Sequence, residues 1–388
     1  MVSHYNILHY LSLMLLLCSC VDEFDAGLSD TETRILVIEG TIVSDSDCTF
    51  HLSHSLPLQA STAALDDCQI ADAQVSVRGS DGQSWTARLT EPGSYVVPVG
   101  HLSSEAQYWL TVNWEGHDYA SSPQSPLTTP AIASISFEQP RSDQEVDILV
   151  TPNQEVASST DGSQYFRWNF EEYWEVRTPL TTIYDYSSEF DSIFVTDLRP
   201  NRGWCQKLTS TVTVASNADY VDGQIRGLRL HTLDRDDVRF GTRYCIQVTQ
   251  TAINREEYEY ETLSARLSDE MGGLFTPQPS SLPTNVTCQD ADLQVIGYIG
   301  VSQNVATRRL YIDRAEVGSQ YAHAVDILDE ERAREYTWAA IYALGYRPYQ
   351  YFPDFNSVTW VARCCVDCTD PVWGASLTPP DWWESSRE

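Results

Sequence analysis

An alternation of hydrophobic and polar side chains with a period of two runs through most of this chain and limits what it can fold into. Four early segments show it, at residues 34–43, 73–78, 84–89 and 108–114. Turn sequences containing Asp-Gly and Pro-Gly separate these segments, as expected between short antiparallel strands. The spacing predicts an immunoglobulin- or transthyretin-like β-sandwich over residues 34–125.

The same alternation continues beyond a stretch rich in proline and serine at residues 121–132, where we place a domain boundary. Residues 133–388 are predicted to form a second, larger β-rich domain with a cysteine-rich C-terminal tail. Aromatic and polar residues alternate over 165–176. The predicted fold class is therefore mostly β, a sandwich followed by a larger β-rich domain with one or two short helices.

Two segments of the second domain have a helical pattern. Asn254 is a good N-cap for a helix that ends at Gly272. A second helix is predicted from Asp329 to Leu344, with Gly345 as its stop. Its buried stripe would be Ala333, Tyr336, Ala340 and Leu344.

The first 20 residues indicate export. Residues 7–17 form an apolar run that is too short to span a bilayer but suits the core of a signal peptide. The run ends in Leu17-Cys18-Ser19-Cys20, the arrangement at which a lipoprotein signal peptide is cut before an acylated cysteine. We expect residues 1–19 to be this signal peptide, Cys20 to be lipidated and residues 20–33 to form an acidic tether. The alternatives are an ordinary signal peptide or a hydrophobic first helix.

The net charge of the chain limits the kinds of partner that it can bind. The formal net charge is −31, and Lys207 is the only lysine. A chain this acidic repels phosphate backbones, so nucleic-acid binding is excluded. No other run of about 18 apolar residues occurs, so the lipid anchor is the predicted membrane attachment.

Eight cysteines remain beyond Cys20: Cys48, Cys68, Cys205, Cys245, Cys288, Cys364, Cys365 and Cys368. An even number in an oxidising compartment predicts disulfides. The favoured pairs are Cys48 with Cys68, Cys205 with Cys245, and Cys288 with one of the three C-terminal cysteines. Cys365-x-x-Cys368 also has the spacing of a redox or zinc motif, but a second such pair is missing and Pro371 follows closely, so structural disulfides are preferred.

The sequence predicts no catalytic residue, metal site or cofactor. His51 and His54 are the mature chain's only closely spaced histidine pair, and on a strand they point to opposite faces. The acidic runs Glu171-Glu172 and Asp234-x-Asp236-Asp237 are interpreted as solvated groups rather than glycosidase carboxylates or calcium ligands.

Three tryptophans near the C-terminus are candidates for a structural or a binding role. Trp373, Trp382 and Trp383 lie among prolines and are expected to pin the tail to the body. The alternative is that they form an exposed docking patch.

Several segments together resemble one family, the domain-of-unknown-function family 4249 of Bacteroidota envelope lipoproteins. They are residues 36–40, 165–168, 173–175, 273–285, 297–298, 364–368 and 380–383. Residues 313–360 match poorly, as an insertion would.

The resemblance implies a partner rather than a reaction, namely a TonB-dependent outer-membrane transporter. Acidic residues at positions 22, 23 and 25 resemble the export signal of such lipoproteins and imply that the chain faces the cell exterior. We therefore expect a non-enzymatic accessory subunit of a TonB-dependent nutrient-uptake system, anchored by lipid in the outer membrane. The alternatives are a free-standing carbohydrate- or peptide-binding surface lipoprotein and an unrecognised hydrolase.

Overall fold

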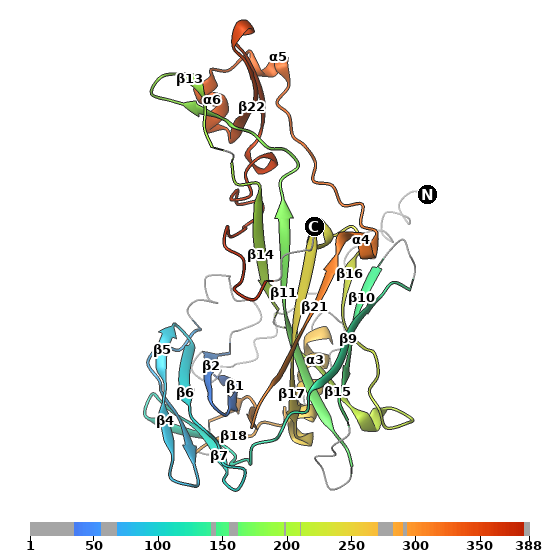
Figure 1. The fold of residues 1–388 in the computed structure, drawn as a ribbon. Coiled ribbons are helices and arrows are strands. Elements are labelled where there is room, and N and C mark those ends of the chain that lie inside the picture. Colours follow the sequence, from blue (N-terminus) through green and yellow to red (C-terminus); the bar gives the residue numbers. More distant parts are fainter. Residues whose placement is uncertain are drawn as a thin grey trace, which may run out of the picture.

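The protein is built mainly from strands, as the period-two alternation predicts. A computed structural model describes residues 35–55, 68–140, 145–154, 162–197, 199–209, 211–270, 282–289 and 293–383. Figure 1 shows a β-sandwich at one end, a central β domain, and a narrow lobe that projects from the central domain at the other end. Cys20, the predicted signal peptide and tether, the predicted helix stop Gly272 and residues 273–281 of the family-like segment 273–285 lie outside the described residues.

The N-terminal sandwich has two sheets. One has the order β19-β1-β2-β6-β5 with β20 also pairing β1, and the other has the order β18-β8-β7-β3-β4. Its strands are β1 (Leu36–Val43), β2 (Ser46–His54), β3 (Gln74–Gly79), β4 (Ser84–Thr86), β5 (Arg88–Glu91), β6 (Ser94–Val99), β7 (Tyr108–Trp114), β8 (His117–Ser121), β18 (Val286–Cys288), β19 (Val295–Ile296) and β20 (Ile299–Ser302). Alternate residues of β1, β2 and β7 point inward, so that Ile38, Phe50 and Tyr108 are fully buried between the sheets.

The sandwich is completed by a segment that the predicted boundary assigns to the second domain. β19 and β20 pair in parallel with β1, and β18 pairs with β8. Pairing between segments about 170 to 260 residues apart leaves no local signal, so a division at the proline-rich stretch misses it.

The central domain also has two sheets, ordered β16-β10-β9 and β14-β11-β17-β21, with β15 pairing β11. Its strands are β9 (Ile132–Glu138), β10 (Glu145–Pro152), β11 (Tyr165–Arg177), β14 (Arg202–Leu208), β15 (Thr213–Ser216), β16 (Leu228–Asp234), β17 (Arg243–Ile253) and β21 (Ala306–Asp313). Its helical elements are η1 (Asn217–Asp219), η2 (Val238–Phe240), α3 (Arg255–Glu270) and α4 (Arg314–Val317). β11 is the longest of the described strands and runs from the sandwich end of this domain to the base of the lobe (Figure 1).

Helix α3 forms where the N-cap predicts it. The backbone N–H of Glu257 donates to Oδ1 of Asn254 at 2.7 Å. Arg167 of β11 then joins α3 to the sandwich, because its guanidinium contacts Oε1 of Glu257 at 2.9 Å and donates to the hydroxyl of Thr41 at 2.6 Å.

The apical lobe consists of two β-hairpins and two short helices. Its elements are β12 (Tyr184–Ser187), β13 (Ser192–Val195), α5 (Glu330–Ala333), α6 (Trp338–Ala343), β22 (Tyr346–Phe352), η3 (Pro353–Phe355) and β23 (Ser357–Ala362), with η4 (Arg363–Cys365) at its base. The single helix predicted over Asp329–Leu344 is wrong. Thr337 starts a new helix by accepting a hydrogen bond from the Ala340 N–H at 3.3 Å, and Tyr336 and Leu344 are exposed rather than buried.

Within the described residues, no helix combines the length and the apolar character that crossing a bilayer would need.

Candidate functional site

The apical lobe is the strongest candidate for a functional surface, because it has a core of its own. Tyr186, Leu328, Ile341 and Trp360 are buried together, and the half-buried Trp338 packs against them. Since Tyr186 comes from the β12–β13 hairpin and the others from residues 328–360, two distant parts of the sequence build one small unit.

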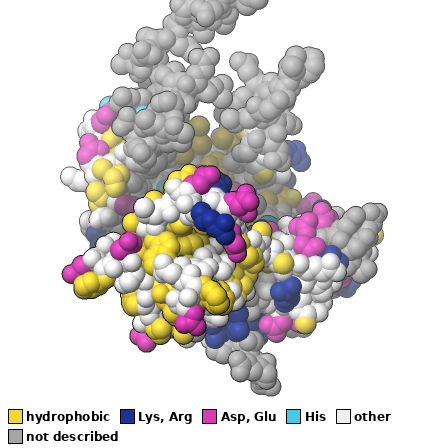
Figure 2. Space-filling model, turned by 90° about the horizontal axis from the view of Figure 1, so that it is seen from above, with side chains coloured by type: hydrophobic (Ala, Val, Ile, Leu, Met, Phe, Trp, Pro, Cys, Tyr) yellow, Lys and Arg dark blue, Asp and Glu magenta, His cyan; other side chains and the backbone are white. Residues whose placement is uncertain are grey.

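The lobe also exposes large hydrophobic side chains. Of the eighteen large hydrophobic residues that are exposed in the described chain, ten belong to the lobe and its approach: Ile183, Phe190, Phe194, Val195, Val325, Ile327, Tyr336, Leu344, Phe352 and Phe355. Phe190 is 73% and Phe355 is 81% exposed. Seen from above, hydrophobic side chains gather over the part of the molecule that faces the viewer, with acidic and basic groups between them (Figure 2). Single exposed hydrophobic residues are ordinary, whereas such a concentration is typical of an interaction surface.

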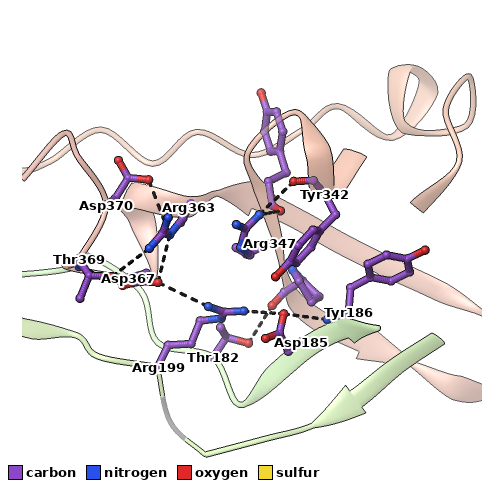
Figure 3. A network of polar contacts seen from close by, with 12 residues as sticks. Thr182, Asp185, Tyr186, Arg199, Tyr342, Arg347, Arg363, Asp367, Thr369 and Asp370 are labelled. Carbon is purple, nitrogen blue, oxygen red and sulfur yellow. Dashed lines mark hydrogen bonds and ion pairs between the residues drawn. The ribbon is translucent and has the colours of Figure 1, made fainter. Parts of the chain in front are cut away.

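A partly buried ionic network links the lobe to the central domain (Figure 3). Nη2 of Arg199 lies 2.5 Å from Asp185 in the β12–β13 hairpin, and its Nη1 lies 3.5 Å from Asp367 below the β22–β23 hairpin. Nε of Arg363 contacts the same Asp367 carboxylate at 3.2 Å. Asp367 is buried, which raises its pKa, but hydrogen bonds from Thr369 and the Arg363 guanidinium outweigh burial and lower the pKa below its usual value.

A second arginine braces the lobe from inside. The guanidinium of Arg347 on β22 donates to the backbone carbonyls of Tyr342 and Tyr346 at 3.1 and 2.7 Å and lies 3.9 Å above the Tyr342 ring. Thr182 below the β12–β13 hairpin donates to the Pro348 carbonyl at 2.9 Å. The Arg347 contacts join α6 to β22, and the Thr182 contact joins β22 to the segment that leads into the β12–β13 hairpin. The exposed side chains of the lobe are therefore carried by an ordered scaffold.

The neck is the narrow region where the chain enters and leaves the lobe. The ascending chain, residues 319–328, meets β23 at residues 326–328, where the Ala362 N–H donates to the Asp326 carbonyl at 2.9 Å and the Leu328 N–H donates to the Trp360 carbonyl at 2.9 Å. The returning chain is joined to the body through the Cys368 N–H, which donates to the Pro200 carbonyl at 2.7 Å.

A cleft of about 320 Å³ opens at the neck. Arg177, Arg314, Tyr321, His323 and Trp373 are among the residues that line it. The buried Glu175 beneath it is held by Arg177 and Arg202, each at 2.8 Å. The cleft therefore presents aromatic rings and guanidinium groups above the Glu175 carboxylate, whose charge Arg177 and Arg202 balance.

The structure joins none of the three predicted cysteine pairs. Cys68 lies beside His54 at the end of β2, six residues along the strand from Cys48, which corresponds to about 20 Å. Cys205 and Cys245 lie on β14 and β17, which flank β11 on opposite sides, so about 10 Å separates them where a disulfide needs less than 7 Å.

The remaining cysteines lie in two separate parts of the molecule. Cys288 packs against the sandwich core on β18, whereas Cys364, Cys365 and Cys368 lie at the neck, so the pairing predicted between them is also wrong. Cys205 packs instead with Cys368, and both are free thiols.

The two acidic runs differ in exposure: Asp234 and Asp236 are exposed, as predicted, whereas the prediction for Glu172 is wrong. Glu172 is buried, not solvated, and its Oε1 accepts hydrogen bonds from Arg239 at 2.7 Å and from the Tyr244 hydroxyl at 2.9 Å. Alternation along β11 carries this signal, because Glu172 shares a face with the buried Phe170.

Asp234, Asp236 and Asp237 serve local structure. Asp234 accepts from the Asp236 N–H at 2.7 Å, and Asp237 accepts from the Arg239 N–H at 2.9 Å. His51 of the predicted histidine pair is exposed, with its ring 3.2 Å from the Ser94 hydroxyl, and His54 bonds to the Ser55 carbonyl.

Aromatic side chains pin the C-terminal tail to the body, as predicted. Trp382 packs edge-on against Tyr173 at 4.7 Å with the Arg309 guanidinium 3.9 Å from its ring, and Trp383 packs edge-on against Tyr311 at 5.6 Å. The indole Nε1 of Trp373 donates to the Cys364 carbonyl at 2.8 Å.

Comparison with known proteins identifies one family, through a family model. The family model described as "Domain of unknown function (DUF4249)" matches residues 21–308. The match ends before α5, α6 and the β22–β23 hairpin, so most of the lobe lies beyond it. No curated protein matches the chain.

Among solved structures, a DUF4785 family protein from Legionella pneumophila is similar over 55% of this chain and 50% of its own, at 8% identity. This chain thus spans about half the length of that protein. The TM-score is 0.16, which is too low to indicate a shared fold.

Proposed function

The chain belongs to the DUF4249 family, and on that premise we propose that it is an outer-membrane lipoprotein that acts as a non-enzymatic accessory subunit of a TonB-dependent nutrient-uptake system. In this proposal Cys20 carries the lipid and the apical lobe contacts the transporter. The observation that carries it is the concentration of exposed hydrophobic side chains on a braced lobe at the far end from the sandwich.

The exposed area is large enough for specific binding. Phe190, Phe194, Phe352 and Phe355 are between 44% and 81% exposed. At 150–250 Å² per aromatic side chain they offer roughly 500 Å² to a partner. Each partner in a standard interface contributes about 800 Å², so these rings can supply its hydrophobic centre.

The lipid anchor leaves the lobe free to reach its partner. The chain enters the described structure at residue 35, next to β1 in the sandwich. A fully extended tether from Cys20 to that point spans at most about 50 Å. A body on such a tether can present either its end or its side to a barrel in the same membrane.

Co-purification tests this proposal. The lipidated protein is isolated from native membranes in mild detergent, and its companions are identified by mass spectrometry. A double variant F190S/F355S is compared with L208S/V221S, which removes two side chains of similar exposure from the body.

We expect a stoichiometric β-barrel transporter with the wild type and the body variant, and at least a tenfold loss with the lobe variant. A lone lipoprotein in every preparation would contradict the accessory role. Equal recovery with both variants would contradict the role of the lobe.

A second candidate function is capture of a free carbohydrate or peptide ligand, and the neck cleft favours it. Trp373 and Tyr321 offer ring faces and Arg177 offers a charged donor in a space that suits a small ligand. A glycan array and a peptide library probed with W373A as the control would detect it, and an absence of hits with the wild type would argue against it.

A further inference from the structure

The neck of the lobe brings together two thiols and an imidazole. Cys364 and Cys365 are consecutive residues of η4, and His323 comes from the ascending segment about forty residues earlier. One ring nitrogen of His323 and the Sγ atoms of the two cysteines lie within 4.8 Å of one another. Both cysteines carry free thiols.

We propose that His323, Cys364 and Cys365 bind a thiophilic d¹⁰ metal ion of the Zn²⁺ type, and that this ion clamps the neck of the lobe. Zn²⁺ binds cysteine sulfur at about 2.3 Å and histidine nitrogen at about 2.0 Å in tetrahedral geometry, which places neighbouring sulfur ligands about 3.8 Å apart. Separations of up to 4.8 Å therefore need only small side-chain rotations to reach that geometry.

His323 has the properties expected of a metal ligand. Its Nε2 is buried and has no hydrogen-bond partner within the described part of the chain. A buried polar atom left in this way destabilises a protein, and a bound ion would satisfy it. Burial also lowers the pKa of His323, which favours the neutral imidazole that metals bind.

The surroundings hold the sulfur ligands in place. The Asp326 N–H donates to Sγ of Cys365 at 3.4 Å, and the Trp373 indole donates to the Cys364 carbonyl at 2.8 Å. Trp373 also packs edge-on against the His323 ring at 4.5 Å. Such outer contacts orient metal ligands and are a regular part of metal sites.

An ion would have to displace the thiol proton of Cys364. Burial and then the neighbouring Cys365 raise the pKa of Cys364 to about 11, so its sulfur is protonated in the metal-free protein. His323 and Trp373 also line the neck cleft, which gives an ion a path from solvent. With three protein ligands, the fourth position is left for water.

The clamp has a structural consequence. His323 belongs to the chain that rises into the lobe, and Cys364 and Cys365 belong to the chain that returns from it. An ion between them would cross-link the neck in addition to its backbone hydrogen bonds. We therefore expect metal to fix the orientation of the lobe relative to the central domain.

Zn²⁺ and Co²⁺ binding to the full-length lipidated protein tests the proposal. The protein is reduced without oxygen in detergent, and alkylation in a parallel sample confirms that the thiols are accessible to reagent. Equilibrium dialysis gives the Zn²⁺ stoichiometry, and Co²⁺ gives the near-ultraviolet charge-transfer band of thiolate ligation. The variants are C364S, C365S and H323A, with C288S and H117A as matched controls outside the neck.

We expect one ion per chain for the wild type and both controls, loss of the charge-transfer band in C364S and C365S, and at least tenfold weaker Zn²⁺ binding in H323A. H323A keeps both thiols, so it stays informative if a cysteine variant fails to fold. An absence of binding to the reduced wild type would overturn the proposal, as would equal weakening in the controls. A Cys364–Cys365 disulfide that forms in the native protein and resists reduction would also overturn it. None of these outcomes depends on the transporter partner.

Discussion

Replacing Arg199 with alanine should release the lobe from the central domain. Arg199 is 13% exposed and lies between Asp185 at 2.5 Å and Asp367 at 3.5 Å. Its removal leaves Asp185 without this counter-ion, while Asp367 keeps Arg363 at 3.2 Å. Breaking a buried ion pair by removing one partner destabilises a protein by about 3–5 kcal/mol, and the lower end applies here because Asp185 is half-buried and Asp367 keeps a partner.

Arg226 provides the matched control. It forms an ion pair with Asp222 at 2.6 Å, but the two side chains are 64% and 52% exposed. Exposed pairs contribute only about 0–1 kcal/mol, because water and salt screen them. The two substitutions therefore remove the same kind of contact at similar distances and differ in burial.

Hydrogen exchange measured by mass spectrometry shows which segments of the backbone lose protection in each variant. A loss of about 3 kcal/mol corresponds to roughly 10²-fold faster opening, which should appear at amides of residues 326–362 in R199A while the sandwich stays protected. In R226A the same amides should exchange as in the wild type. Equal protection of the lobe in both variants would refute the reasoning that a buried network holds it.

Three further substitutions test other parts of the structure. Burial raises the pKa of Glu257 to about 7 from a usual 4.5. Because the pKa is higher in the folded state, the contribution of Glu257 to the free energy of unfolding is fully present below pH 4.5 and is lost as pH rises through 7. The wild type should thus lose about 3 kcal/mol over this window relative to E257Q in urea titrations, and parallel pH profiles would contradict this. W383A should destabilise the protein by about 3–5 kcal/mol in urea unfolding, and less than 1 kcal/mol would mean that the tail is not pinned. G297A should abolish a folded sandwich in circular dichroism, since φ is +148° and a Cβ would lie 2.0 Å from the Ile38 carbonyl oxygen; G223A, with open space around it, should fold, and equal yields would contradict the argument.

Local signals in the sequence predict local structure well here. Alternation places the strands of the sandwich and β11, and Asn254 places the start of α3. Both signals act within a few residues, where side-chain periodicity and capping decide the backbone.

Long-range features leave no such signal. The return of residues 286–302 to the sandwich depends on pairing with β1, and the cysteine count says nothing about which sulfurs the fold brings together. His323 joins Cys364 and Cys365 only because two chain segments cross at the neck. The burial of Glu172, in contrast, was available from the alternation of β11.

The most direct test of the central claim is photo-crosslinking in intact cells. A photoreactive amino acid is placed at Phe190 or Phe355 in the lobe, and at Leu208 or Val221 in the body as controls. Crosslinked products are purified and identified by mass spectrometry. We predict that the two lobe positions capture one TonB-dependent outer-membrane transporter and that the body positions do not. Crosslinks to that transporter from the body alone, or no discrete partner from the lobe, would contradict the claim that the lobe is the partner-binding surface of a membrane-tethered accessory protein.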